Sequence, residues 1–448
     1  MGINEKIFKA YDIRGTYPAE LNEEAAYAIG RALARRSRAK TIVVGSDMRL
    51  SGPALKVKLI EGINDEGADV IDVGLVSVDT IYFVVGILKY EAGIMITASH
   101  NPPEYNGFKM VLKDMAWIRG QELKDDVLNL PFEPAGSKGK VTVTDILPQY
   151  IQHVLSFCDV KKISPLKIVV DAGNGMAGKI MPLLQSHLPV EIIPLNFKLD
   201  GSFPAHLSNP LLPQSQAQLQ AEVLKQQADL GVVFDGDTDR LVFVDEKGQV
   251  ISADHSLLLM AKEFLNREPG AKIVYNLICS KIVPEKIIEW GGQAVRCAVG
   301  YVNVSAAVRE SGAAMGGELS AHYCFRDNAY ADSGFISFVL ILQLLSESNR
   351  PLSEIMSAFH KYVKTPEINF EVDNRDEIIT IIGLLKEKYA DGAQDEVDGL
   401  TVQYPNWWFN ARPSNTEPLL RITAEADNQP LLDQKINELQ TLAEEFKK

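Results

Sequence analysis

The sequence predicts an α/β protein of several domains that ends in a smaller α+β domain. Apolar, strand-like runs alternate with helical patterns along most of the chain, which is typical of mostly parallel sheets covered by helices. The chain has 448 residues. At about 150 residues per domain, that length suggests roughly three domains and leaves room for a fourth.

The predicted strands each lead into a turn and then a helix. Helices are predicted on both sides of the first of these strands, over residues 22–36 and 53–66. The strand–turn–helix unit recurs at residues 45–47, 171–175 and 235–237, which suggests one architecture used three times. The clearest strand-like runs are residues 41–45, 167–171, 231–235 and 272–276.

The longest apolar run, residues 335–345, predicts a buried helix. It follows Asp332-Ser333-Gly334, which is a helix-start signal, and it stops before Pro351. The run is too short to cross a bilayer.

The C-terminal part of the chain breaks the alternation. It predicts a strand over residues 401–404, a loop, a strand over 419–426 and an amphipathic helix over 430–447. This order predicts the smaller α+β domain.

Composition excludes several classes of function. The net charge of −14 argues against nonspecific nucleic-acid binding, although a local basic cluster can still bind an anion. The N-terminal residues have no signal-peptide core, so we expect a cytoplasmic protein with no membrane partner. The four cysteines are scattered without a CxxC pair, which predicts reduced thiols rather than a zinc site or disulfides. They are Cys158, Cys279, Cys297 and Cys324.

The first chemical motif is the segment Thr97-Ala98-Ser99-His100-Asn101-Pro102-Pro103. It follows the apolar residues 94–96, which predict a buried strand. Each proline disfavours the helical region for the residue before it, so the chain stays extended. Ser99 is therefore predicted on a rigid loop just past a strand end, where α/β proteins gather catalytic groups.

The second motif is Asp235-Gly236-Asp237-Thr238-Asp239-Arg240. Three alternate carboxylates can converge on one hard cation, and they leave room for a phosphate oxygen, which suits Mg²⁺. An EF-hand loop is rejected because Arg240 stands where glycine is required and the flanks predict strands. A haloacid-dehalogenase-type phosphatase fits less well because Asp239 takes the place of a threonine. A plain turn would rarely carry the repulsion among three aspartates.

Two further motifs carry polar and basic groups. Glu318, Ser320 and His322 alternate, so an extended loop would turn them to one side, although a loop with a satisfied histidine is the plainer interpretation. The segment Arg412-Pro413-Ser414-Asn415-Thr416-Glu417-Pro418, followed by Arg421, predicts an anion cradle, with a solvated turn as its plainer interpretation.

Together these segments resemble the α-D-phosphohexomutase superfamily, in its bacterial phosphomannomutase/phosphoglucomutase branch. The resemblance begins at residues 11–15, includes Asp200-Gly201-Ser202-Phe203-Pro204 and ends at the Arg412 segment. It implies four domains around a central cleft, of which three are related α/β/α domains with mixed sheets and the fourth is α+β. We place them at residues 1–150, 151–253, 254–365 and 366–448.

The resemblance also implies roles for individual residues. Ser99 would carry a phosphoryl group, and one Mg²⁺ would be held by Ser99, Asp235, Asp237 and Asp239. Arg14, His100, Lys109 and His322 would assist phosphoryl and proton transfer. Substrate would be bound by Arg240, Tyr301, Glu318 and Ser320 at the sugar and by Arg412, Ser414, Asn415, Thr416 and Arg421 at the phosphate.

The implied reaction interconverts hexose 1-phosphate and hexose 6-phosphate of mannose or glucose, with glucose or mannose 1,6-bisphosphate as intermediate and activator. Departures from the family pattern at Thr238, residues 77–80, residues 276–278 and Tyr301 leave the sugar open. The alternatives are a phosphoglucosamine mutase, a metal-dependent sugar phosphatase with Asp235 as nucleophile, and a noncatalytic sugar-phosphate sensor. We expect a small-molecule sugar phosphate as the only partner and a monomer, with a dimer left open.

Overall fold

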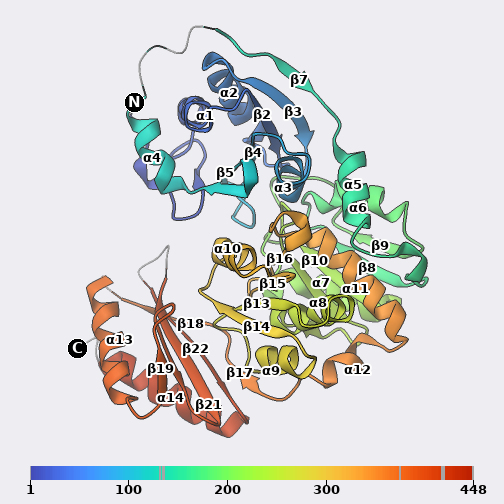
Figure 1. The fold of residues 1–448 in the computed structure, drawn as a ribbon, viewed down its shortest axis with the longest axis vertical. Coiled ribbons are helices and arrows are strands. Elements are labelled where there is room, and N and C mark those ends of the chain that lie inside the picture. Colours follow the sequence, from blue (N-terminus) through green and yellow to red (C-terminus); the bar gives the residue numbers. More distant parts are fainter. Residues whose placement is uncertain (1, 131–132, 134–136, 373–374, 415–418, 446–448) are drawn as a thin grey trace.

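Four β-sheets follow one another along the chain and lie around an arc in the view of Figure 1. The computed structural model describes residues 2–130, 133, 137–372, 375–414 and 419–445. The domain boundaries placed from the sequence stay predictions. Among the helices of the described residues, none combines the length and apolarity that crossing a membrane requires. All four cysteines are free.

The first sheet is mixed, because its central strands run parallel while the strands at one side run antiparallel. In spatial order its strands are β1 (Ile13–Thr16), β5 (Tyr105–Leu112), β4 (Ala92–Ile96), β2 (Thr41–Ser46), β3 (Asp69–Leu75) and β7 (Val141–Val143), and β6 (Ala116–Ile118) pairs with β5. Its helices are α1 (Glu23–Ser37), α2 (Gly52–Asp65), α3 (Val78–Gly86) and α4 (Gly120–Leu128).

The second and third sheets are also mixed. The second has the order β12 (Val250–Ile251), β11 (Leu241–Asp245), β10 (Leu230–Phe234), β8 (Lys167–Asp171) and β9 (Glu191–Leu195). The third has the order β14 (Gln293–Cys297), β13 (Lys272–Asn276), β15 (Met315–Gly317) and β16 (Tyr323–Phe325). The helices along this stretch are α5 (Leu147–Leu155), α6 (Ala177–Gln185), α7 (Pro213–Gln226), α8 (Ala253–Arg267), α9 (Ile282–Glu289), α10 (Tyr301–Ser311), α11 (Gly334–Ser348) and α12 (Leu352–Ser357).

The fourth sheet is antiparallel throughout its described strands. Its order is β17 (Val363–Lys364), β22 (Leu419–Ala426), β21 (Trp407–Pro413), β20 (Leu400–Gln403) and β19 (Ala393–Asp395), and β18 (Ile368–Glu371) also pairs with β22. Two helices, α13 (Arg375–Lys388) and α14 (Gln429–Glu445), belong to this unit. Antiparallel strands with two helices give the predicted α+β domain.

One predicted element of this unit is wrong. The segment between the two predicted C-terminal strands is not a loop throughout, because Trp407–Pro413 forms β21 and pairs with both β20 and β22. The aromatic residues Trp407, Trp408 and Phe409 favour a strand; all three are buried, and Trp407 and Phe409 belong to the unit's core. Pro413 stands at the end of the strand, where it interrupts pairing least.

Helix α11 confirms the predicted buried helix. It lies in a core shared by the first three units, together with residues of α3, α5 and α8. Its N-cap is Ser333, whose side chain accepts a hydrogen bond from the backbone of Ile336. Because α11 packs on several units at once, its residues 335–345 are apolar except for Ser337 and Gln343.

The same hairpin recurs in the first three units, and each time its loop carries one of the predicted motifs. Strand β4 leads through the Ser99 loop into antiparallel β5, and β10 leads through the three aspartates into antiparallel β11. Strand β15 leads through residues 318–322 into antiparallel β16. The strands that enter these loops are parallel to their other neighbours, so all three loops leave at the carboxyl edge of a parallel pair.

Candidate functional site

The Ser99 loop is buried and held in one shape by contacts from distant parts of the chain. Ser99 is 2% exposed and has a φ of 48°, which is unusual for a residue other than glycine. Its backbone N–H donates to Thr97 Oγ1 at 2.9 Å, and Thr97 Oγ1 in turn donates to Asp237 Oδ2 at 3.0 Å. The loop therefore fixes Ser99 directly against the three aspartates.

Arg49, which the sequence analysis missed, binds the backbone of this loop. Its side chain is fully buried, and its guanidinium donates to the backbone carbonyls of Ser99, Asn101, Pro102 and Tyr105 at 2.6–2.9 Å. Asp47 lies 3.4 Å from its Nε and balances its charge. One planar group thus satisfies four carbonyl oxygens of a loop about fifty residues away in sequence.

Asp235, Asp237 and Asp239 form a compact buried group. Each offers an oxygen, and these oxygens lie within 4.8 Å of one another. Ser99 Oγ donates to Asp235 Oδ2 at 2.8 Å. Lys109 Nζ donates to Asp237 Oδ2 at 2.9 Å and to Asp239 Oδ2 at 2.6 Å. The Ser99 hydroxyl and the Lys109 ammonium therefore face the same carboxylate group.

Burial and the neighbouring charges shift the pKa values in this group in opposite directions. Burial raises the pKa of Asp235 well above its usual value, and the charge of Asp239 adds to the rise. Burial also opposes ionisation of Asp239, but Lys109 outweighs it and holds that pKa well below the usual value. Despite burial, Asp237 and Asp239 raise the pKa of Lys109 well above its usual value.

The three aspartates fit a divalent cation. Oδ1 of Asp237 and Oδ1 of Asp239 are buried, and neither is hydrogen-bonded to any residue in the described ranges. Buried carboxylate oxygens without partners are costly unless a cation neutralises them. The donors are all oxygens, which matches the preference of Mg²⁺.

His322 lies in a second polar group with Glu318 and Ser320. Its Nδ1 is 3.0 Å from Glu318 Oε1 and 2.9 Å from Ser320 Oγ, and Ser320 also donates to Glu318. The ring's other nitrogen, Nε2, is 3.4 Å from Asp239 Oδ1, so this group joins the three aspartates. Burial disfavours the imidazolium, but the charge of Asp239 outweighs it and raises the pKa of His322 to about 10.

Four more predicted residues adjoin these groups. Arg14 donates to Asn101 Oδ1 at 2.5 Å, in the Ser99 loop. His100 Nδ1 is 3.4 Å from Ser99 Oγ, and burial holds the pKa of this histidine well below its usual value. Arg240 Nε is 3.2 Å from His322 Nε2. The Tyr301 ring lies 5.4 Å from the His322 ring and 5.8 Å from that of Trp117.

The residues predicted for phosphate binding lie elsewhere. Arg412 and Arg421 face each other across β21 and β22, in the fourth sheet, which Figure 1 places apart from the first. Both form ion pairs with Glu367, and Arg421 Nη1 is 3.1 Å from Glu367 Oε1. Ser414 is buried at the end of β21 and donates its N–H to the Leu419 carbonyl at 2.8 Å. Asn415 and Thr416 lie outside the described residues.

A second missed residue is Asp332, which the sequence analysis treated only as part of a helix start. It is buried, and its Oδ2 is 3.9 Å from His322 Nε2.

The site thus combines a buried serine hydroxyl, a carboxylate group that fits a cation, three basic side chains and two histidines. Such a set can hold a phosphoryl group, neutralise its charge and move a proton.

Comparisons with known proteins match the whole chain to one family. Four family models, described as phosphoglucomutase/phosphomannomutase alpha/beta/alpha domains I, II and III and the C-terminal domain, match residues 5–126, 148–248, 252–362 and 367–440. A protein of Escherichia coli K12 named phosphomannomutase is 37% identical over 451 residues, covering 98% of this chain and 99% of that protein. One of Pseudomonas aeruginosa named phosphomannomutase/phosphoglucomutase is 38% identical over 434 residues, covering 95% and 93%.

Solved structures match as well. A phosphoglucomutase/phosphomannomutase family protein from Burkholderia thailandensis superposes with a TM-score of 0.91 at 35% identity, covering 99% of this chain and 98% of that one. The N-acetylphosphoglucosamine mutase of Aspergillus fumigatus, solved with GlcNAc-6P and magnesium, shares the fold with a TM-score of 0.65 at 14% identity, covering 98% and 96%.

Proposed function

The chain belongs to the phosphoglucomutase/phosphomannomutase family, and from this premise we propose that it interconverts the 1-phosphates and 6-phosphates of mannose, glucose or both. It is a mutase, which moves a phosphoryl group between two positions of one sugar. The observation that carries the proposal is the hydrogen bond from Ser99 Oγ to Asp235 within the buried carboxylate group that also holds Lys109. The names of the relatives favour this function over an aminohexose mutase or a phosphatase.

In the proposed reaction, Ser99 Oγ carries the phosphoryl group that enters the sugar. The bond between phosphorus and Ser99 Oγ breaks as a bond forms from phosphorus to the free sugar hydroxyl, which loses its proton. The resulting hexose 1,6-bisphosphate, of glucose or mannose, then returns its other phosphoryl group to Ser99. The same bisphosphate, added from outside, would restore phosphoserine and so activate the enzyme.

One divalent cation per chain, Mg²⁺ by its oxygen donors, would be held by Asp235, Asp237 and Asp239 with an oxygen on Ser99. When bound, it supplies positive charge against the phosphoryl oxygens. Lys109, which already contacts two of these carboxylates, contributes a fixed positive charge at the same place. Arg14 would orient the loop through Asn101 and add a further positive charge.

His322 is the proposed proton acceptor. With a cation bound to Asp239, the charge that raises the pKa of His322 would be cancelled, and the ring would then lose its proton to solvent. The proton of the sugar hydroxyl would pass to Nε2, where Asp332 at 3.9 Å stabilises the imidazolium. Glu318 and Ser320 fix the ring through Nδ1. His100 stays neutral, because burial lowers its pKa, so it would position the phosphoryl group without adding charge.

Recognition of the sugar would fall to residues around His322. Glu318 Oε2 accepts from the Gly300 N–H at 2.9 Å, which fixes the carboxylate for contact with hydroxyls. Ser320 and Arg240 offer donors beside it, and the half-buried Tyr301 ring gives the group one apolar wall. Because Tyr301 replaces the family's usual histidine here, we propose that it contributes to the choice of sugar.

The phosphate that stays on the sugar would bind in the fourth unit. Arg412 and Arg421 form a basic pair across two strands, and Ser414 lies beside them, with Asn415 and Thr416 completing the proposed set. Binding energy from this remote phosphate would orient the reacting end of the sugar. We further propose that the chain acts as a monomer.

A coupled assay tests the function. Mannose 1-phosphate and glucose 1-phosphate should each be converted to the 6-phosphate after priming with glucose 1,6-bisphosphate and Mg²⁺. Ser99→Ala should lose nearly all turnover yet still bind Mg²⁺, because the three aspartates remain. Failure of the phosphorylated protein to turn over either sugar would refute the proposal, and full activity of Ser99→Ala would remove Ser99 from its role.

A further inference from the structure

Asp332 is a buried carboxylate that lies 3.9 Å from His322 Nε2, beyond hydrogen-bond distance. It stands between β16 and α11 and is 1% exposed. Neither of its oxygens accepts a hydrogen bond from any residue that the structure describes. An ionised carboxylate without partners is costly to bury, so this position favours a cation nearby.

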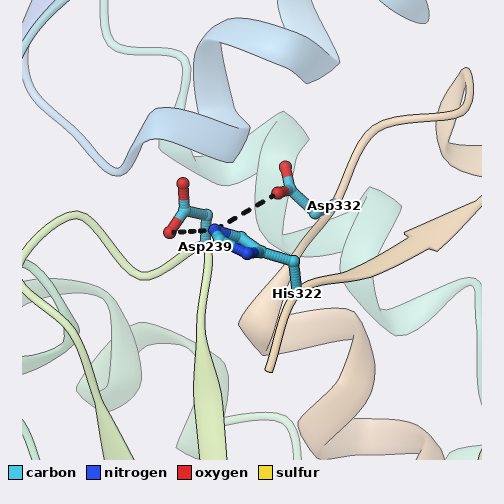
Figure 2. A group of neighbouring side chains, drawn as sticks. All are labelled: Asp239, His322 and Asp332. Carbon is cyan, nitrogen blue, oxygen red and sulfur yellow. Dashed lines mark ion pairs between the residues drawn. The ribbon is translucent and has the colours of Figure 1, made fainter. Parts of the chain in front are cut away.

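His322 turns its Nε2, which also lies 3.2 Å from Arg240 Nε, toward this carboxylate. In Figure 2 the ring lies between Asp239 and Asp332, and dashed lines join Nε2 to both. Its Nδ1 points to Glu318 Oε1 at 3.0 Å. A histidine that binds a metal usually donates its other ring N–H to a carboxylate, which fixes the ring and strengthens the ligand. His322 already has this partner.

The distances favour metal ligands over direct hydrogen bonds. Charge-assisted N–H···O bonds span about 2.7–2.9 Å, whereas Nε2 is 3.4 Å from Asp239 Oδ1 and 3.9 Å from Asp332 Oδ2. With zinc bonds of about 2.0–2.2 Å and a tetrahedral angle, two ligand atoms lie about 3.4 Å apart. The three ligand atoms lie within 4.8 Å of one another, so a small shift would complete the geometry.

We propose that Asp239, His322 and Asp332 form a second cation site, which takes a transition-metal ion of the Zn²⁺ type in preference to Mg²⁺. The imidazole provides the selectivity, since Mg²⁺ prefers oxygen ligands and Zn²⁺ binds nitrogen well. Three protein ligands leave a fourth position for water or substrate oxygen. The imidazole proton leaves to solvent when the ion binds.

The second site shares Asp239 with the three-aspartate group, and both would use its Oδ1. Oδ2 of Asp239 accepts from Lys109, whereas Oδ1 faces His322 and accepts no hydrogen bond within the described part of the chain. This oxygen would therefore bridge the two cations when both sites are filled. If His322 accepts the sugar proton, as in the proposed function, an ion at Nε2 blocks that step, and Zn²⁺ inhibits the Mg²⁺-activated enzyme.

Metal binding tests the site without any assay of turnover. Metal-free protein in millimolar Mg²⁺ is dialysed against Zn²⁺, and bound zinc is measured by elemental analysis. Titration with Co²⁺ follows the visible absorption of a site with a nitrogen ligand. We expect one tightly bound Zn²⁺ per chain, with affinity at least tenfold lower in Asp332→Asn and in His322→Gln. Asp245→Asn, a buried aspartate at the far end of β11, is the matched control and should bind like the wild type.

The outcomes separate the site from the enzyme function. Unchanged zinc affinity in both ligand variants, or displacement of Zn²⁺ by Mg²⁺ one for one, would overturn the site. Near-UV circular dichroism checks each variant, and if Asp332→Asn is misfolded, His322→Gln decides alone. Zinc that binds here without slowing turnover leaves the site standing and refutes His322 as the proton acceptor, whereas absence of any mutase turnover refutes only the proposed function.

Discussion

Arg49 Nη2 donates a hydrogen bond to the backbone carbonyl of Ser99 at 2.8 Å, from the turn that follows β2 to the loop that follows β4. The same side chain holds three more carbonyls of that loop. Ser99 has a left-handed φ of 48°, a conformation that persists only when its surroundings enforce it. Arg49 is therefore a positioning residue for the proposed phosphoryl carrier.

Arg49→Lys should lower kcat about 100-fold with little change in KM. Lysine keeps the charge, but its single ammonium cannot donate to four carbonyls at once, so the loop should shift. A displacement of about 1 Å at a reacting group lowers the rate by roughly 100-fold. Steady-state kinetics with glucose 1-phosphate measure the effect. Arg350→Lys is the control, because Arg350 lies between α11 and α12 and forms an exposed pair with Glu354. A wild-type kcat for Arg49→Lys would contradict the role.

Glu367→Gln should lower the KM for sugar phosphates roughly twofold to fivefold and leave kcat unchanged. Glu367 now pairs with both Arg412 and Arg421, so a phosphate must compete with its carboxylate for the two guanidiniums. The size of the KM change follows from the free energy of a partly exposed ion pair, which is about 0.2–1 kcal/mol. Glu371→Gln, at the end of the strand β18 that begins just after Glu367, has an exposed side chain and should leave KM unchanged. An unchanged or higher KM for Glu367→Gln would show that Glu367 does not compete with the phosphate.

The motif loops could be predicted because their signals are local. In each case an apolar strand is followed at once by polar residues, as in residues 94–96 before Ser99 or Leu230–Phe234 before Asp235. The parallel sheets expected from the alternation are mixed instead, because each motif loop joins an antiparallel hairpin. Periodicity alone does not show whether the next strand reverses.

The residues that were missed act through contacts distant in sequence. Nothing next to Arg49 distinguishes it from a surface arginine, since its partners lie about fifty residues further on. In the sequence, Asp332 belongs to the helix-start signal of α11, and that signal does not indicate where the carboxylate of Asp332 points. Strand β21 ends in Arg412 and Pro413, which belong to the anion motif, so its sequence favours a loop. Pairing with β20 and β22 holds it as a strand.

Asp79→Asn should change how stability depends on pH. Asp79 accepts from Tyr150 at 2.5 Å and from Ser333 at 2.6 Å, so it joins α3, α5 and the start of α11. Burial raises its pKa from 3.8 to about 6. The folded protein then binds the proton more tightly than the unfolded chain, so stability falls as the pH rises from about 4 to 6 and is constant above that.

Two pKa units correspond to about 3 kcal/mol, and the asparagine variant should lack this decline. Urea unfolding midpoints of the two proteins, measured from pH 4 to pH 6, give the comparison. The wild type should lose stability relative to the variant across this range. Parallel profiles would mean that Asp79 ionises as it does in the unfolded chain.

Asp254→Asn should loosen the fourth unit on the third. Asp254 begins α8, is 3% exposed, and its Oδ2 lies 3.0 Å from Lys364 Nζ on β17, while the same oxygen accepts from the Ser280 N–H at 3.1 Å. Burial opposes its charge, but Lys364 outweighs burial and holds the pKa of Asp254 well below its usual value. The pair therefore stabilises the folded protein above about pH 4, and this contribution is lost as the pH falls further.

The substitution removes one partner of a buried ion pair and leaves Lys364 without its counter-charge. The free energy of unfolding should therefore fall by about 3 kcal/mol or more. The loss should appear as faster hydrogen exchange in β17 and β22 and as a higher KM, since the unit that would grip the phosphate moves more freely. Lys361→Met is the matched control, because Lys361 and Glu285 form an exposed pair whose removal should cost little. Equal exchange rates in the wild type and Asp254→Asn would show that other contacts, such as Lys281 with Glu425, hold the fourth unit in place.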